Sequence, residues 1–300
     1  ASFDMAMSGQ TSQPKQKSYS KVLHTKRAIR GLICILFCLL SLLPFLLMIM
    51  NATRTSGDIQ AGVSLIPSSH LMENWNMLLQ KQNGMRLTLE RAMLNSLCIT
   101  VPGTFLAVYC SCMTAYGIHV YNFKAKKFAW AFIMAIMMVP NQITIIGFYR
   151  FMLKLNLVDT YIPLIIPAIA SPGTVFFLRQ YVLSVMPPSL IEAARIDGAS
   201  ELYTFHRIAI PIMSPGIATM SIMGFIGGWN AYLLPMIILN KNEKFTLPVM
   251  MATLRASTDI TANQGAIYLA VAISVIPILL VFAFFSKYII SSISAGAVKE

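Results

Sequence analysis

The sequence predicts an all-α integral membrane protein with six transmembrane helices, and its composition and its long uncharged runs carry that prediction. Charged residues make up 11% of the 300 positions and hydrophobic residues 56%, with a mean hydropathy of +0.67. Soluble chains carry roughly 25% charged residues, so this chain has too few charges to cover a surface that faces water. The composition therefore argues against a soluble enzyme.

Six runs without Asp, Glu, Lys or Arg give the predicted crossings. Each run is long enough, at about 1.5 Å per residue, to span a hydrocarbon core of roughly 30 Å. The fourth run contains Pro163, Pro167 and Pro172, so we expect it to be kinked or partly irregular. The second and fifth runs exceed one crossing and must include loop or interfacial residues. In order, the runs cover residues 31–51, 92–123, 128–149, 160–178, 208–240 and 260–286.

The basic residues predict the orientation of the chain. The net charge is +12, and most of the 23 Lys and Arg residues fall on one side when both termini and the even-numbered loops are placed together. Under the positive-inside rule that side is the cytoplasm. The charge therefore reflects topology and contact with membrane lipid, and we expect no nucleic-acid partner. Residues 1–29 form a predicted cytoplasmic tail without the apolar h-region of a signal peptide, and residues 30–300 form one transmembrane domain.

The first outer loop, residues 52–91, is long enough for a small external structure. Within it, residues 71–80 (LMENWNMLLQ) have the apolar spacing of a short amphipathic helix. Such a helix could lie on the membrane surface, contact an external partner or cap the helical bundle, and the sequence leaves these alternatives open.

The inner segment between the fourth and fifth crossings, residues 187–211, predicts a short helix, a glycine bend and a second short helix. A pair of prolines stops the fourth crossing, and Ser189 can cap the helix that follows. Gly198 ends or turns this helix, and Pro211 stands where the chain re-enters the membrane. Two alanines beside the bend allow another backbone to approach closely. The residues alone fit a knob that docks in a groove, and they also fit an ordinary interfacial helix-turn-helix.

The spacing within this segment resembles the EAA loop of ABC importer permeases. Glu192-Ala193-Ala194 is followed by three residues and Gly198, and then, after nine more residues, by Ile208-Ala209-Ile210-Pro211. The one departure is Ile210, where the family usually has Leu. The resemblance covers residues 30–300 and is to the carbohydrate-uptake branch, particularly its maltose-permease-like second subunit. Further strings that carry it are Asp197-Gly198-Ala199, Pro211 with Pro215, Trp229-Asn230 and residues 295–299.

The resemblance implies a non-catalytic subunit of an ATP-driven importer in a bacterial or archaeal cytoplasmic membrane. Its implied partners are a second homologous permease, a dimer of ABC ATPases and an extracytoplasmic solute-binding protein that delivers a sugar or oligosaccharide. This chain has no G-x-x-x-x-G-K-[ST] phosphate cradle, so ATP-Mg would bind to the ATPase partners and no cofactor to this chain. The residues that the resemblance assigns to ATPase coupling are Glu192, Ala193, Ala194, Asp197 and Gly198.

Uncharged polar side chains inside the crossings are candidates for lining the solute pathway, because such groups avoid lipid. Amides can exchange hydrogen bonds with sugar hydroxyls, and an indole face can stack on a sugar ring. Hydrogen bonds between helices are an equally open explanation. The candidates are Asn141, Gln142, Thr144, Trp229 and Asn230. Gly224 and Gly228 form a GxxxG pair that indicates close helix packing, within this chain or against the partner permease.

Other functions fit the sequence less well. The four His residues are scattered and the 20 Met residues are typical of apolar packing, so we assign no metal site. A secondary transporter commonly needs ionisable groups within the membrane, which the six runs lack. No constellation of an intramembrane enzyme is present. Within the ABC permeases, a polyamine or phosphate cargo remains an alternative to a sugar.

Overall fold

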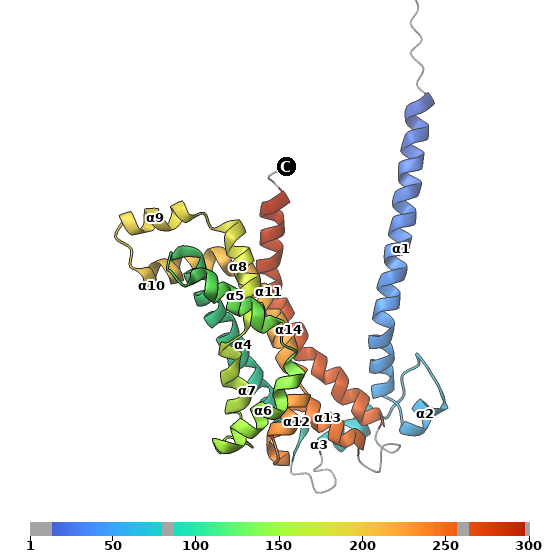
Figure 1. The fold of residues 1–300 in the computed structure, drawn as a ribbon. Coiled ribbons are helices and arrows are strands. Elements are labelled where there is room, and N and C mark those ends of the chain that lie inside the picture. Colours follow the sequence, from blue (N-terminus) through green and yellow to red (C-terminus); the bar gives the residue numbers. More distant parts are fainter. Residues whose placement is uncertain (1–13, 80–86, 257–263, 298–300) are drawn as a thin grey trace, which may run out of the picture.

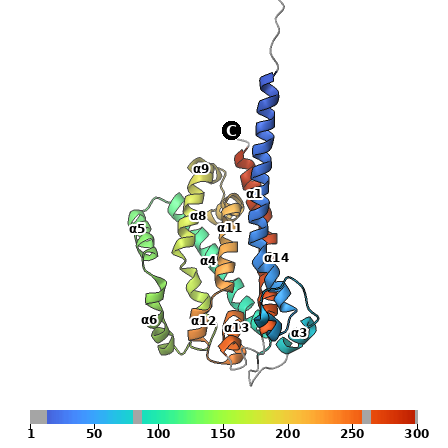
Figure 2. The same cartoon turned by 90° about the vertical axis from the view of Figure 1, so that its right-hand side faces the viewer.

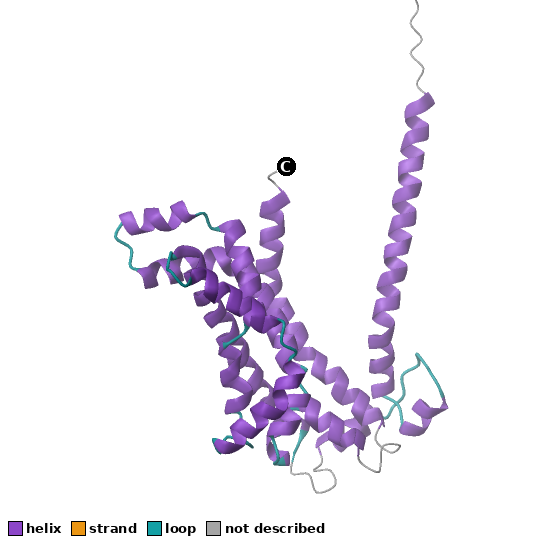
Figure 3. Ribbon diagram, in the orientation of Figure 1, coloured by secondary structure: helices purple, strands orange, loops and turns teal. Residues whose placement is uncertain are grey.

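The computed structural model describes residues 14–79, 87–256 and 264–297, and within these ranges the chain is built of helices and loops, with no strand (Figure 3). Among the described residues, five helical stretches are long and apolar enough to cross a membrane. They correspond to the first, second, fourth, fifth and sixth predicted crossings, which confirms those five. The stretches are Lys26–Ala52, Leu89–Val120, Ile162–Val185, Glu201–Trp229 and Gln264–Tyr288.

The third predicted crossing is two helices, and this corrects the expectation of one helix over residues 128–149. Helix α5 (Lys126–Met137) and helix α6 (Asn141–Lys154) are bent by 100° at the break between them. Pro140 is the N-cap of α6. Its ring has no N–H to donate and disfavours a helical conformation of the residue before it, so the helix stops there. Counted as one broken span, the pair gives six crossings.

The fourth crossing is irregular, as its prolines predict, and the fifth run includes loop residues, as its excess length predicts. The fourth consists of α7 (Ile162–Ile165), the 3₁₀ turn η1 (Ile166–Ile169) and α8 (Pro172–Val185). The fifth run ends its long helix, α11 (Ile210–Trp229), well before residue 240 and continues as the short α12 (Leu233–Ile238). Four further elements of the bundle are α4 (Leu89–Val120), η3 (Asn242–Lys244), α13 (Leu247–Ala256) and α14 (Gln264–Ala297).

Helix α4 lies at the centre of the bundle and packs against both α8 and α11. The GxxxG pair of α11 faces it. A Cβ atom added to Gly228 would lie 3.0 Å from the methyl carbon of Thr100, and one added to Gly224 would lie 3.3 Å from that of Thr104. The glycines therefore serve a close helix contact within this chain, and the partner permease is not needed to explain them.

Helix α1 (Pro14–Ala52) stands apart from the bundle for most of its length (Figure 1). None of its most apolar window is buried inside the chain, and Leu32 is 69% exposed. Apolar side chains can face hydrocarbon at no cost, so this helix is compatible with a lipid environment.

The predicted amphipathic helix of the first outer loop is present as α3 (Leu71–Leu79), after the short α2 (Ser56–Ala61). It packs on the start of α14. The amide nitrogen of Asn74 donates to the carbonyl oxygens of Ala52 at 2.9 Å and Arg54 at 3.1 Å. Of the three alternatives, capping the bundle is therefore the one that the structure supports.

The beginning of α1, the end of α14 and the helix α9 (Pro188–Ile196) all lie at the same end of the molecule, whereas α3, α12 and α13 lie at the opposite end (Figures 1 and 2). Helices α5 and α6 together run from the first end to the second along one side of the bundle (Figure 2). We call the end where α9 lies the α9 end, and the opposite end, where α3, α12 and α13 lie, the clasp end. Both described terminal helices thus share a side with the inner loop, as the charge distribution predicts.

Candidate functional site

Helix α9 begins at a proline pair that fixes the backbone. Pro187 is the N-cap, with no side-chain hydrogen bond, and Pro188 occupies the first helical turn. A proline there has its φ preset for a helix and loses no hydrogen bond, because the first N–H groups are unpaired anyway. The expectation that Ser189 caps this helix is wrong, since Ser189 lies inside the first turn.

Gly198 ends α9 in a left-handed turn. Its φ is +77°, a conformation that L side chains rarely adopt. The N–H of Gly198 donates to the carbonyl of Arg195 at 3.0 Å, and the N–H of Ala199 donates to that of Ala194 at 3.0 Å. This pair of bonds is the Schellman C-cap. No atom of the described chain lies within 4 Å of a Cβ built on Gly198, so the bend is open to a partner.

The two faces of α9 differ sharply in exposure. Ile191 and Ala194 are buried against the bundle at 2% and 6% exposure. On the other face Glu192 and Ala193 are exposed, and Ile196, at the last helical position, is 86% exposed. Asp197 and Gly198 in the following turn are exposed as well. The segment thus presents small, acidic and apolar groups outward from a face that is fixed in place.

The second helix of the segment runs without a break into the fifth crossing. Ser200 caps α10 (Glu201–Thr204) by accepting from the N–H of Tyr203 at 3.3 Å. The π-helical turn η2 (Phe205–Ala209) then leads directly into α11. Pro211 therefore lies within a continuous helix. The expectation of a separate short helix before Pro211 is wrong. A movement of α10 can pass along this helix into α11.

A cluster of polar side chains ties the segment to the end of α4. The guanidinium of Arg195 donates to Glu201 at 2.8 Å, and the hydroxyl of Tyr121 donates to the same carboxylate at 2.6 Å. Arg195 also lies over the Tyr121 ring, 5.6 Å from its centre. The hydrogen bond to Glu201 raises the pKa of Tyr121, because it stabilises the protonated phenol.

Two histidines add further connections at this end. The Nε2 atom of His119, on α4, lies 2.9 Å from the carbonyl oxygen of Met186, just before the proline pair. The Nε2 atom of His206, in η2, lies 3.1 Å from the hydroxyl of Tyr109 on α4. Together with the cluster around Glu201, these contacts join the residues before α9 and those after α10 to helix α4.

The candidate pathway residues do not converge on one site. Trp229 is 1% exposed, stacks on Phe225 with ring centres 5.7 Å apart and donates its indole N–H to the carbonyl of Ser274 at 3.0 Å. Trp229 thus makes a hydrogen bond between helices, which is the alternative to a place on the solute pathway. Gln142, Thr144 and Asn230 are exposed, and the side chain of Asn141 lies outside the described part.

Sequence reasoning missed a cavity of about 330 Å³ between α4, α7, η1, α11 and α12. Its polar lining consists of hydroxyl groups that are scattered along the chain, so no local motif signals it. Within the described ranges, no group of three or more His, Cys, Asp or Glu side chains is placed to hold a metal ion.

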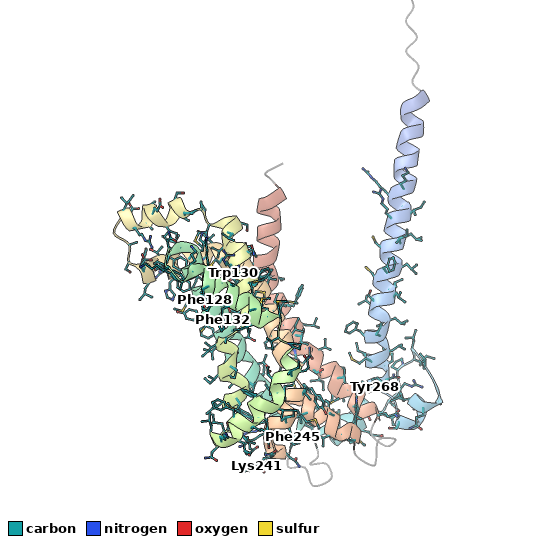
Figure 4. The ribbon with its side chains drawn as sticks, in the orientation of Figure 1. Phe128, Trp130, Phe132, Lys241, Phe245 and Tyr268 are labelled. Carbon is teal, nitrogen blue, oxygen red and sulfur yellow. The ribbon has the colours of Figure 1, made fainter. Side chains whose placement is uncertain are left out.

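Arg179 on α8 is held by aromatic contacts. Its guanidinium carbon lies 4.0 Å from the ring centre of Trp130, which stacks on Phe176. Trp130 belongs to the row of aromatic side chains on α5 that Figure 4 labels together with Phe128 and Phe132. This cation–π contact fixes α5 against α8 beside the α9 end.

Comparisons with known proteins agree on one family. Residues 103–295 match the family model described as "Binding-protein-dependent transport system inner membrane component". The chain is 34% identical to the arabinooligosaccharides transport system permease protein AraQ of Halalkalibacterium halodurans, over 87% of this chain and 92% of that protein. It is 28% identical to the diacetylchitobiose uptake system permease protein NgcG of Streptomyces coelicolor, over 90% of this chain and 88% of that protein.

A solved structure has the same fold. It is the crystal structure of a bacterial ABC transporter involved in the import of the acidic polysaccharide alginate, with a TM-score of 0.75 and 20% identity. The match covers 88% of this chain and 96% of that chain.

Proposed function

This chain belongs to the binding-protein-dependent transport system inner membrane components, and on that premise we propose that it is the permease subunit through which an ATP-driven importer passes a sugar or oligosaccharide. The observation that carries the cargo class is the 34% identity to a permease named for arabinooligosaccharides, which extends over nearly the full length of both chains. A second relative is named for diacetylchitobiose, another saccharide.

The EAA loop, residues 187–211, is the proposed contact with the ATPase. The exposed face of α9 carries Glu192 and Ala193, and the turn that follows carries Asp197 and Gly198. Ala194, the fifth residue assigned to coupling, is buried and would hold the helix on the bundle. Because α10 continues into α11, closure of an ATPase pair on α9 would rock the fifth crossing and alternate access to the pathway.

The further partners follow from this assignment. A second homologous permease would complete the pathway, and an extracytoplasmic binding protein would deliver the solute to the clasp end. ATP-Mg would bind only to the ATPase subunits. The α9 end would face the cytoplasm, together with both terminal helices, in a bacterial or archaeal cytoplasmic membrane. Helix α1, whose apolar side chains from Ile29 to Leu46 are exposed, would face lipid or the second permease.

The pathway itself is proposed to run along the exposed polar side chains of the bundle. Gln142, Thr144 and Asn230 are accessible, so their amides and hydroxyl can exchange hydrogen bonds with a passing sugar. Asn141 is retained on the basis of its sequence position alone. Trp229 would instead hold α11 against α14 from behind the pathway.

Reconstitution of this chain into liposomes with the second permease, the ATPase and the binding protein tests the proposal. We expect uptake of an arabinooligosaccharide that requires ATP and the binding protein and that vanadate inhibits. Uptake driven by an ion gradient without ATP would indicate a secondary transporter and contradict the proposal.

The same assay tests the cargo class. Another relative, 26% identical over 88% of this chain, is named as an sn-glycerol-3-phosphate transport system permease protein of Brucella abortus. Uptake of this phosphate ester in preference to every saccharide would contradict the proposed cargo and leave the ABC permease assignment unchanged.

A further inference from the structure

A cavity between the helices is lined by hydroxyl groups and carries no charged side chain. It measures about 330 Å³ and lies between α4, α7, η1, α8, α11, α12 and the loop before α13, toward the clasp end. At roughly 30 Å³ for each water it has room for about ten water molecules or for one ring-sized solute. Its hydroxyl-bearing residues are Thr100, Thr104, Ser171, Thr174 and Thr246.

Two of these hydroxyls are buried without a partner. Thr100 is 3% exposed and Thr246 is 4% exposed, and the Oγ1 atom of each makes no hydrogen bond within the described chain. Buried hydroxyls in folded proteins almost always have a partner. Two residues of the same cavity wall thus carry hydroxyls with unused hydrogen-bonding capacity, which an occupant that donates or accepts hydrogen bonds would satisfy.

The rest of the wall restricts what that occupant can be. Ser171 and Thr174 already bond to each other, with 2.8 Å between their oxygens, so they can share only their remaining capacity. Alanines, glycines and aliphatic side chains make up the other surfaces. A phosphate or an ammonium group would enter without a counter-charge, which is costly away from water. An uncharged molecule with several hydroxyls and apolar C–H faces matches both parts of the wall.

We propose that this cavity binds one uncharged, polyhydroxylated ring of the transported solute, with Thr100 and Thr246 as its hydrogen-bonding residues. This inference rests on the proposed function, since it names where a saccharide is held inside this subunit. The packing of α11 shapes the site: a Cβ on Gly228 would lie 3.0 Å from the methyl of Thr100 and 3.5 Å from its hydroxyl. Close helix contact at Gly228 thus fixes the direction of the Thr100 side chain.

Protection of single cysteines tests this site in the complete transporter. Thr100→Cys and Thr246→Cys are made separately in a chain whose five native cysteines are replaced, and each reacts with a small uncharged thiol reagent. We expect both to react. At an arabinooligosaccharide concentration about ten times its dissociation constant, reaction should slow roughly tenfold, as mass action requires. sn-Glycerol-3-phosphate at the same concentration should leave the rate unchanged.

Thr219→Cys is the matched control. Thr219 lies on α11 but not on the cavity wall, and its hydroxyl donates to the carbonyl of Pro215 at 2.9 Å. The sugar should not alter its reactivity. Uptake is measured on the same preparation. A transporter that moves the sugar while neither cavity cysteine is protected, or while neither reacts at all, overturns the cavity site and leaves the proposed function intact.

Discussion

The two ends of the bundle hold their loops in different ways. At the clasp end, the carboxylate of Asp159 accepts from the backbone N–H groups of Asn240 and Lys241, both at 3.1 Å, and from the ammonium of Lys244 at 3.0 Å. The N–H of Asp159 donates to the carbonyl of Ile238 at 2.8 Å. Figure 4 labels Lys241 at this end.

The ion pair at the α9 end is more exposed to solvent. Arg195 and Glu201 have side chains that are 40% and 46% exposed, whereas that of Asp159 is only 17% exposed. The outward face of α9 has no contact within the described chain that would prevent a partner from binding. The difference indicates that the clasp end resists movement and that the α9 end receives it.

The largest effect should follow from a substitution that strains the left-handed turn at Gly198, at the α9 end. Gly198→Val places a β-branched side chain at a φ of +77°, and a left-handed conformation costs an L residue about 1–2 kcal/mol or more. We expect solute moved per ATP hydrolysed to fall by roughly tenfold, with normal insertion and assembly. Gly147→Val on α6 is the control, because its Cβ would meet nothing within 4 Å at an ordinary φ. Normal coupling in the Gly198 variant would refute the assignment.

Removing the contacts of Asp159 at the clasp end should mainly lower the stability of the fold. Asp159→Ala leaves the ammonium of Lys244 and two backbone N–H groups without their acceptor and places Ala at a φ of +61°. We expect a loss of about 1–3 kcal/mol in the free energy of unfolding, seen as a lower midpoint of thermal unfolding in detergent. Asp159→Asn keeps an acceptor and tolerates this φ, so its loss should be smaller. Equal losses in the two variants would show that the acceptor oxygen and the tolerance of this φ, which only Asn keeps, do not matter.

Removing one bond at the α9 end should have a modest effect. Tyr121→Phe deletes the hydroxyl that donates to Glu201 at 2.6 Å and keeps the ring against Tyr116. A hydrogen bond of this kind contributes about 1 kcal/mol, so solute moved per ATP should fall by up to about fivefold. Tyr232→Phe, at the clasp end, should leave this ratio unchanged. If both variants behave alike, the cluster around Glu201 does not transmit movement.

The smallest effect is expected from mild acid, acting on the carboxyl group of Asp159 at the clasp end. Burial opposes ionisation of Asp159, but the N–H of Lys241, the ammonium of Lys244 and the N–H of Asn240 together hold its pKa below the usual value. A carboxyl with a lowered folded-state pKa contributes stability that is present above its unfolded pKa of about 3.9 and is lost as pH falls through the folded pKa. Hydrogen exchange of the Asn240 amide should therefore be equally protected at pH 7 and pH 5. Loss of protection near pH 5 would contradict this.

The sequence predicts the crossings well because their signal is long. Five uncharged runs coincide with spanning helices, since burial in lipid depends on summed hydropathy over about 20 residues. The break before Pro140 escapes that sum, because Val139 and its neighbours are apolar in either conformation. The Ser189 cap failed for a similar reason: a proline at the first helical position starts a helix without a capping side chain.

The candidate site was predictable only where it is local. The spacing from Glu192 to Gly198 predicts the helix and the left-handed turn, both of which are present. Which polar groups face a pathway depends on how helices rotate against each other, and Trp229 proved to be buried against α14. Thr100 and Thr246 lie far apart in the chain and meet at one cavity only in the folded bundle.

Cross-linking of α9 tests the central claim most directly. A single cysteine at the exposed Ala193, in an otherwise cysteine-free chain, is coupled to a short photoactivatable group in the assembled transporter. A cysteine at Leu71, which is 47% exposed on α3 at the clasp end, serves as the comparison. We predict that Ala193→Cys is linked to the ATPase subunit and that Leu71→Cys is not. A transporter that takes up solute while Ala193→Cys forms no link to the ATPase would contradict the assignment of α9 as the coupling contact.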